Sequence, residues 1–151
     1  MIALKQFLSF SLALTIVSCA APVIHNTPSG RPEITMNAKV GKKVQAEIMN
    51  LMVNKGYTLK SSNENLLVFE KTLDSFAARL FLGSSYDTTP NARVTYNIIE
   101  TEKSTRVVAS FIAVTNPGSA FEKITDLNGG KATQEIQEAL NEISLKLLKE
   151  Y

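Results

Sequence analysis

The chain has 151 residues, of which 44% are hydrophobic and 20% are charged, a composition that excludes a wholly disordered protein and suits one folded domain. Sixteen basic and fourteen acidic residues leave a formal net charge of +2, so the sequence lacks the basic surface typical of nucleic-acid-binding proteins. The single histidine and single cysteine exclude a disulfide framework and most zinc sites. We therefore expect no cofactor, no metal and no nucleic-acid partner.

The amino-terminal residues have the layout of a secretory signal. Lys5 precedes an apolar stretch at 7–17, which is shorter than the roughly 18 residues that a membrane-spanning helix needs. The stretch runs into Ile16–Cys19, which resembles the lipobox of bacterial lipoproteins. This resemblance implies that signal peptidase II removes residues 1–18 and that Cys19 carries acyl chains such as palmitate. The alternative is a buried Cys19 thiol in an uncleaved helix.

The lipobox resemblance also implies a location and a first partner. Several acyl chains on Cys19 hold a protein firmly to a membrane, because each buried methylene contributes about 0.8 kcal/mol. The next residue is Ala20 and not aspartate, which in a Gram-negative cell implies sorting to the outer membrane. We expect a cell-envelope lipoprotein that faces the periplasm.

Residues 19–32 have the composition of a linker. They contain three prolines, a serine and a glycine close together and no periodic apolar pattern. We predict a flexible tether that spans about 20 Å. His25 lies within it, and we expect this histidine to be solvated and without function.

The predicted folded domain covers residues 33–151 and begins with a strand and a helix. Glu33–Met36 is a short strand, and Asn37 is a plausible helix N-cap. Gly41 is unfavourable within a first helical turn, so a later helix start is the alternative. Apolar residues then recur at helical spacing as far as Gly56, which supplies the left-handed position after the helix. The apolar positions are Val40, Val44, Ile48, Leu51 and Met52.

A hairpin and an ambiguous segment follow. Tyr57–Lys60 and Leu66–Leu73 have strand patterns, and a polar turn separates them. Asp74–Leu82 fits either a short helix or a continuation of the strand. We expect a loop from Gly83 to Ala92.

The central part of the domain holds the clearest strands, at Arg93–Glu100 and Arg106–Thr115. In the second strand, the residues that would point to one face and those that would point to the other are both mainly apolar. That strand is therefore either covered on both faces or presents an apolar surface to a ligand or partner. Asn116–Lys131 is a long connection, and Ala132–Tyr151 is an amphipathic helix.

The element order β-α-β-β-(short α)-β-β-α predicts an α+β fold. Two amphipathic helices bury their apolar stripes by lying on one face of a sheet. We expect a two-layer sandwich, with a mostly antiparallel sheet of four to five strands.

The loops before Arg93 and after Thr115 should emerge at the same end of the sheet, because the turn at 101–105 closes the other end. Loops that share one end of a scaffold are a good place to look for a binding site. The alternative is that the loops pack on each other, with Arg93 paired to a loop carboxylate and Phe121 filling the end of the core. The candidate binding residues are Tyr86, Asp87, Asn91, Arg93, Asn116, Phe121, Glu122 and Asp126.

Short strings in the domain carry a second resemblance. Asn116–Glu122, together with Gly56-Tyr57 and Leu67–Glu70, is similar to small bacterial lipoproteins of unknown function. The resemblance implies no catalytic residues.

Three function classes remain, in order of preference. The first is a non-enzymatic module that binds a protein partner of the envelope. The second is a carrier or sensor of an apolar or peptidoglycan-derived ligand, which predicts an enclosed apolar cavity of about 300 Å³ or more. The third is a small hydrolase that uses carboxylates such as Glu100 and Glu102. Asp126–Gly129 faintly resembles the start of a calcium loop but lacks the distal glutamate, because position 137 is Gln137.

Overall fold

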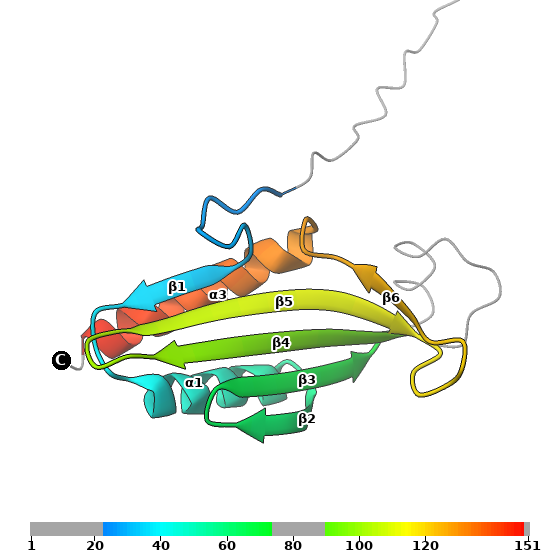
Figure 1. Cartoon of the computed structure of the whole chain (residues 1–151), viewed down its shortest axis with the longest axis horizontal. Helices are drawn as coiled ribbons and strands as arrows, with labels where there is room; N and C mark the ends of the chain where they lie inside the picture. The colour runs from blue at the N-terminus through cyan, green and yellow to red at the C-terminus, as the bar shows by residue number, and fades with distance from the viewer. Residues whose placement is uncertain (1–22, 74–89, 150–151) are drawn as a thin grey trace, which may run out of the picture.

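The computed structural model describes residues 23–73 and 90–149, which form one sheet with two helices packed on one of its faces (Figure 1). The predicted α+β sandwich is confirmed, and the sheet has six strands where we expected four to five. The ambiguous segment at 74–82 lies outside the described residues. The elements are β1 (Glu33–Met36), α1 (Gly41–Asn54), β2 (Thr58–Asn63), β3 (Leu66–Thr72), β4 (Asn91–Glu100), β5 (Thr105–Thr115), β6 (Lys123–Asp126) and α3 (Lys131–Leu148).

The sheet is antiparallel throughout and has the order β1-β5-β4-β3-β2. The additional strand, β6, lies within the segment that we predicted to be an irregular connection. It pairs with β5 through Thr115↔Lys123 to Ile112↔Asp126, on the same side of β5 as β1. The four residues of β6 include only one strongly apolar side chain and so show no alternating pattern. Its strand conformation therefore comes from the pairing with β5 and not from its local sequence.

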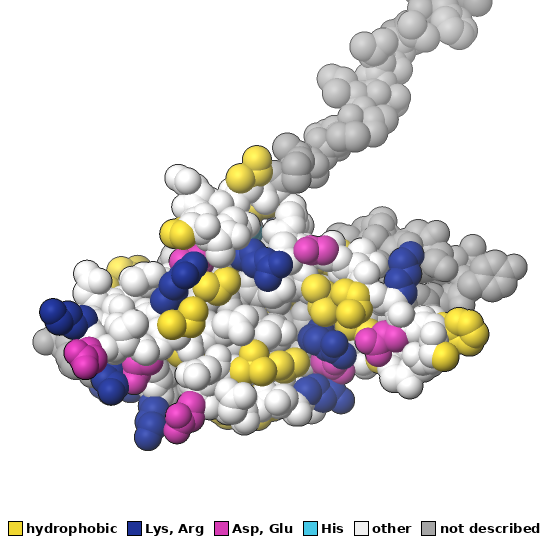
Figure 2. Space-filling model, viewed as in Figure 1, with side chains coloured by type: hydrophobic (Ala, Val, Ile, Leu, Met, Phe, Trp, Pro, Cys, Tyr) yellow, Lys and Arg dark blue, Asp and Glu magenta, His cyan; other side chains and the backbone are white. Residues whose placement is uncertain are grey.

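The core lies between the sheet and the helices. Every second residue of β3, β4 and β5 faces α1 and α3, and the large buried side chains at these positions include Phe69 and Tyr96, whose rings meet edge to face at 6.1 Å. The predicted helical stripes fill the other side of this core through Val44, Ile48 and Leu140 among others. The opposite face of the sheet, here called the outer face, carries a mixture of apolar and charged side chains (Figure 2).

Helix α1 begins later than an N-cap at Asn37 would place it, in line with our alternative of a later start. The helix begins at Gly41 after Val40, with no side-chain cap, and Asn37 is not its N-cap. Glu100, at the end of β4, instead accepts a hydrogen bond of 2.6 Å from the Gly41 amide. A Cβ atom at position 41 would lie 2.5 Å from this carboxylate oxygen, so the glycine permits the approach of an anion that the helix N-terminus favours. Gly56 does adopt the predicted left-handed conformation, with φ of +79°.

Residues 23–32, here called the N-terminal strap, are packed on the domain, so the prediction of a loose tether up to residue 32 is wrong over this range. The Val23 amide donates to the Gly129 carbonyl at 2.8 Å, and the Pro32 carbonyl accepts from the Ala109 amide at 2.8 Å. Between them, Thr27 and Gly30 close a turn with a 3.0 Å hydrogen bond.

His25 also contradicts our expectation. It is only 8% exposed instead of solvated, and burial lowers its pKa. Its Nε2 has no hydrogen-bond partner among the described residues. A proline-rich composition carries no periodic signal, so only contacts with distant residues reveal that this segment is ordered.

Candidate functional site

The β5–β6 hairpin forms one end of the sheet and is built around an internally bonded loop (Figure 1). Thr115 and Lys123 are its last paired residues. The chain then turns through Asn116, with φ of 49°, and Gly118, with φ of 77°. The Glu122 carboxylate accepts a 2.8 Å hydrogen bond from the Gly118 amide, and this bond closes the loop across its base.

This hairpin presents apolar side chains to solvent. Phe121 is 82% exposed and Ile124 is 58% exposed. Ile124 lies opposite Val114, so the two side chains share the outer face, and Val114 is fully buried. Figure 2 shows hydrophobic side chains at this end of the outer face with charged groups around them. Because a large exposed aromatic side chain is costly in water, this surface is a candidate for docking. We call Phe121 and Ile124 the hairpin patch.

A buried carboxylate, Glu70 of β3, organises the neighbouring strands on the outer face. Arg93 of β4 donates to it from Nε at 2.6 Å, and its NH2 nitrogen is also 2.6 Å from the same oxygen. Asn91 Nδ2 donates to the second oxygen at 3.4 Å, and Lys60 Nζ lies 3.8 Å from it. Glu70 was not among the residues that we singled out for function. Its partners complete an ion-pair network that ties β2, β3 and β4 together.

The candidate residues therefore separate into two groups. Asn91 and Arg93 belong to the Glu70 network, whereas Asn116, Phe121 and Glu122 belong to the hairpin loop. Asp126 lies in the same row of the sheet as Arg93, because both pair with Ile112, but it turns to accept hydrogen bonds from Asn128. Tyr86 and Asp87 lie outside the described residues.

One detail of our alternative interpretation of this end, the place of Phe121, is wrong. Within residues 23–73 and 90–149, Arg93 pairs with the strand carboxylate of Glu70, its direct neighbour across the ladder, whereas the loop at 83–89 lies outside this part of the chain. Phe121 does not fill the end of the core, because the loop closes on itself and leaves the ring in solvent.

A second ion pair lies at the other end of β5. Glu33 of β1 is buried and accepts from Arg106 Nε at 2.7 Å and from its NH2 nitrogen at 3.0 Å. The Arg106 guanidinium and the Ser29 amide hold the pKa of Glu33 at about 2, although burial opposes this shift. Gln137 of α3 bonds both the Glu33 amide, at 2.7 Å, and its carbonyl, at 3.0 Å. The Gln137 side chain thus takes the place of a further strand and protects the edge of β1.

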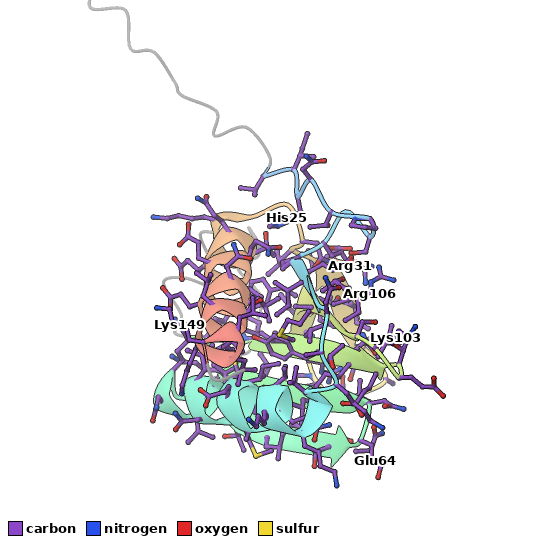
Figure 3. The ribbon with its side chains drawn as sticks, turned by 90° about the vertical axis from the view of Figure 1, so that its left-hand side faces the viewer. His25, Arg31, Glu64, Lys103, Arg106 and Lys149 are labelled. Atoms are coloured by element: carbon purple, nitrogen blue, oxygen red, sulfur yellow. The ribbon has the colours of Figure 1, made fainter. Side chains whose placement is uncertain are left out.

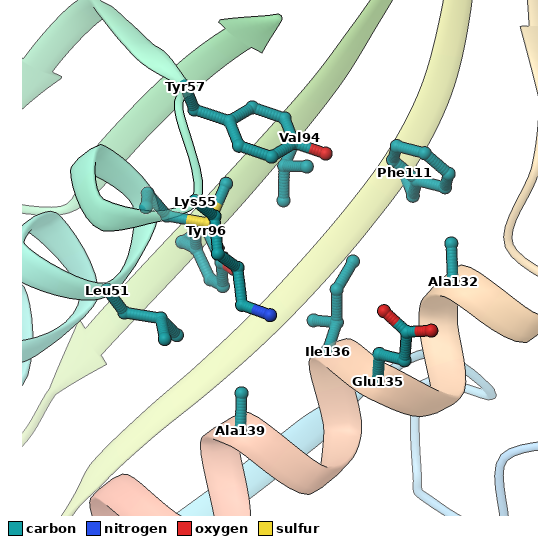
Figure 4. Close-up of a pocket in the computed structure, with 11 residues that line it drawn as sticks. Leu51, Lys55, Tyr57, Val94, Tyr96, Phe111, Ala132, Glu135, Ile136 and Ala139 are labelled. Carbon is teal, nitrogen blue, oxygen red and sulfur yellow. Dashed lines mark hydrogen bonds between the residues drawn. The ribbon is translucent and has the colours of Figure 1, made fainter.

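A small apolar cavity of about 70 Å³ opens where the end of α1 and the beginning of α3 diverge above the sheet (Figure 4). Glu135 of α3 lies beside it, and so do Lys55 and Tyr57, which follow the end of α1. Burial, with a smaller contribution from Glu135, raises the pKa of Tyr57. Tyr96 bonds Met52 Sδ at 3.3 Å, and burial raises its pKa too. Ligand sites usually have volumes of about 300 to 1,000 Å³, so this cavity is too small for such a ligand.

Among residues 23–73 and 90–149, no cluster of three or more His, Cys, Asp or Glu side chains has a geometry suited to a metal ion. No helix in the same residues is long and apolar enough to cross a membrane. No protein-family model matches this chain, and no curated protein matches it either. The case for its function therefore rests on its own residues.

Proposed function

We propose that the protein is a lipid-anchored lipoprotein of the cell envelope, most simply of the outer membrane and facing the periplasm. In this proposal it acts without catalysis and binds a protein partner through the hairpin patch. The lipobox at Ile16–Cys19 supports the anchor. The exposure of Phe121 on an internally bonded loop is the single observation that carries the docking surface.

The chemistry of the patch favours a protein partner. Interface centres are enriched in aromatic side chains, and charged residues surround them. Phe121 has this setting, with Glu122 and Lys123 directly after it in the chain. Glu122 already bonds the loop, so the ring is presented by a preformed loop, which lowers the entropy lost on binding.

The other two function classes have weaker support. The inter-helix cavity of about 70 Å³ falls well below the size that we set for a carrier. The carboxylate of Glu100 accepts from the first amide of α1 and lies 3.7 Å from Lys39 Nζ, so its contacts in the fold already account for this side chain.

Site-specific photo-crosslinking in intact cells tests the docking surface. A benzophenone amino acid replaces Phe121 in one variant and Ile99 in a control, because Ile99 is also exposed, at 48%, but lies near the opposite end of β4. We expect a discrete crosslinked protein from position 121 that is absent at position 99 and is lost when Ile124→Asp is added. Equal crosslinking at both positions, or none at 121, would contradict the docking surface.

The anchor has a separate test. Replacing Cys19 by Ser should release the protein from isolated membranes, because the thioether cannot form. A Ser18→Ala variant keeps a small residue before the cysteine and should remain in the membrane fraction. Retention of the Cys19→Ser variant in the membrane would argue against lipidation.

A further inference from the structure

The N-terminal strap shortens the distance between the proposed anchor and the folded domain. Val23 is bonded to Gly129, and only three residues separate it from Cys19. Four peptide units extend at most about 14 Å. A free tether as far as residue 32 would instead let the domain move well away from the membrane. With Cys19 acylated as proposed, the docked strap keeps the surface around Gly129 within this distance of the lipid headgroups.

Several contacts show that the strap belongs to this surface. Residues Val23–Thr27 line a solvent-open groove of about 350 Å³ together with Gln134, Gln137 and Glu138 of α3. Buried His25 lies in the middle of this stretch. Figure 3 shows His25 at one end of the molecule and Glu64, in the β2–β3 turn, at the opposite end.

Beside the anchor, Ile24 is 86% exposed, which is the highest exposure of the large hydrophobic side chains in the described residues. It is one residue further from Cys19 than Val23, so it cannot lie far from the bilayer. Arg31 of the strap and Lys131, which follows the turn that holds Val23, are also exposed. Cationic side chains at a membrane surface interact favourably with anionic headgroups. An exposed isoleucine that lies five residues after the proposed acyl anchor, on a strap that also carries an exposed arginine, matches the chemistry of a lipid surface.

We propose that the strap, with Ile24 near its first residue, is a membrane-contacting surface that seats the domain on the bilayer in one orientation. In this arrangement Ile24 enters the boundary between headgroups and acyl chains, and the end with Glu64 points away from the membrane. The inference rests on the proposed lipidation of Cys19. It adds a defined orientation, which an anchor on a loose tether would not give.

Nitroxide labelling of the purified lipidated protein tests this orientation. An acylated Cys19 has no free thiol, so introduced cysteines label singly in Ile24→Cys, Lys131→Cys and Glu64→Cys. The proteins are bound to vesicles of phosphatidylethanolamine and phosphatidylglycerol, and the accessibility of each label to oxygen and to a water-soluble nickel complex is measured. Lys131 reports on the domain itself, because it directly follows the turn that holds Val23.

We expect the oxygen-to-nickel accessibility ratio to be several-fold higher at position 24 than at position 64, with position 131 in between. Equal ratios at positions 24 and 64 would overturn the inference, and so would a position 131 that matches position 64, because the strap would then have left the domain. A protein docked over the strap would shield position 24 from both reagents and would also overturn it. Failure of lipidation is recognised separately, because the parent chain would then take up label at Cys19.

Discussion

The two short strands that flank β5 on one side, β1 and β6, show opposite designs. Each has four residues and pairs with the same central strand. Three of the four β1 residues are buried, and Glu33 is bonded to Arg106 and to Gln137 of α3. No residue of β6 is buried, and Ile124 is exposed to solvent. At one end of β5, the edge strand β1 is therefore buried and held by polar contacts. At the other end, β6 leaves apolar surface exposed. We expect this difference between an edge that stabilises the fold and an edge that binds a partner.

The largest effect should come from breaking the buried ion pair of β1. Glu33→Ala removes the acceptor for Arg106 and for the Ser29 amide, and we expect the free energy of unfolding to fall by about 2 to 3 kcal/mol. Denaturant unfolding measures this change. Thr35→Ala, at the exposed position of the same strand, is the matched control and should have a much smaller effect. Similar losses in both variants would show that Glu33 has no special role.

The same ion pair makes a prediction for pH. The pKa of Glu33 is about 2 in the folded protein and near 4.5 without these contacts, so the folded state binds fewer protons than the unfolded state in this range. The stabilisation is complete above pH 4.5 and is lost as the pH falls toward 2. Unfolding measured across this window should depend less on pH in Glu33→Gln than in the parent. An unchanged pH dependence would show that other carboxylates control acid unfolding.

A smaller effect is expected at the link between β1 and α3. Gln137→Ala removes both hydrogen bonds to the Glu33 backbone and should cost about 1 to 2 kcal/mol of stability. Gln134→Ala is the control, because Gln134 is exposed and bonds Glu138 on its own helix. Hydrogen exchange of the Glu33 amide should accelerate in the first variant alone. Unaltered protection of the Glu33 amide in Gln137→Ala would mean that another group protects it from exchange as well as Gln137 does.

The smallest effect on stability should occur at β6. Phe121→Ser and Ile124→Thr change exposed side chains, so each should alter the free energy of unfolding by no more than about 0.5 kcal/mol. Both should nevertheless reduce capture of the envelope partner by a photo-crosslinker placed at the exposed residue Ala120. A large loss of stability would show that the side chains of the hairpin patch stabilise the folded domain. The proposed contrast between a structural β1 and a partner-binding β6 would then be wrong.

Periodic patterns predicted most of the elements but not their ends. The stripes of α1 and α3 and the alternation in β4 and β5 are local signals, and the structure confirms the elements they predicted. The start of α1 at Gly41 could not be predicted, because the carboxylate that accepts from the Gly41 amide belongs to Glu100, which lies 59 residues away in the sequence. Strand β6 was missed for the same kind of reason, since β5 supplies its hydrogen-bond partners.

The candidate site shows the same division. Topology predicted that the beginning of β4 and the end of β5 lie at the same end of the sheet, as their pairing shows, and Phe121 was selected from the sequence alone. The sequence did not predict that Glu70 is the acceptor at the centre of an ion-pair network. That role depends on strand pairing, which places Arg93 directly opposite it. His25 was misjudged because a lone histidine in a proline-rich segment carries no signal of burial.

The sequence by itself determined the class of fold, the two amphipathic helices, the central hairpin and the lipobox resemblance, because each is encoded in residues close together along the chain. Tertiary structure alone decided that the strap is docked, that Glu33 and Glu70 are paired within the sheet, and that Phe121 is exposed. These outcomes depend on contacts between distant segments. The free energy of such contacts is set by which groups meet in the folded chain, and no local pattern records it.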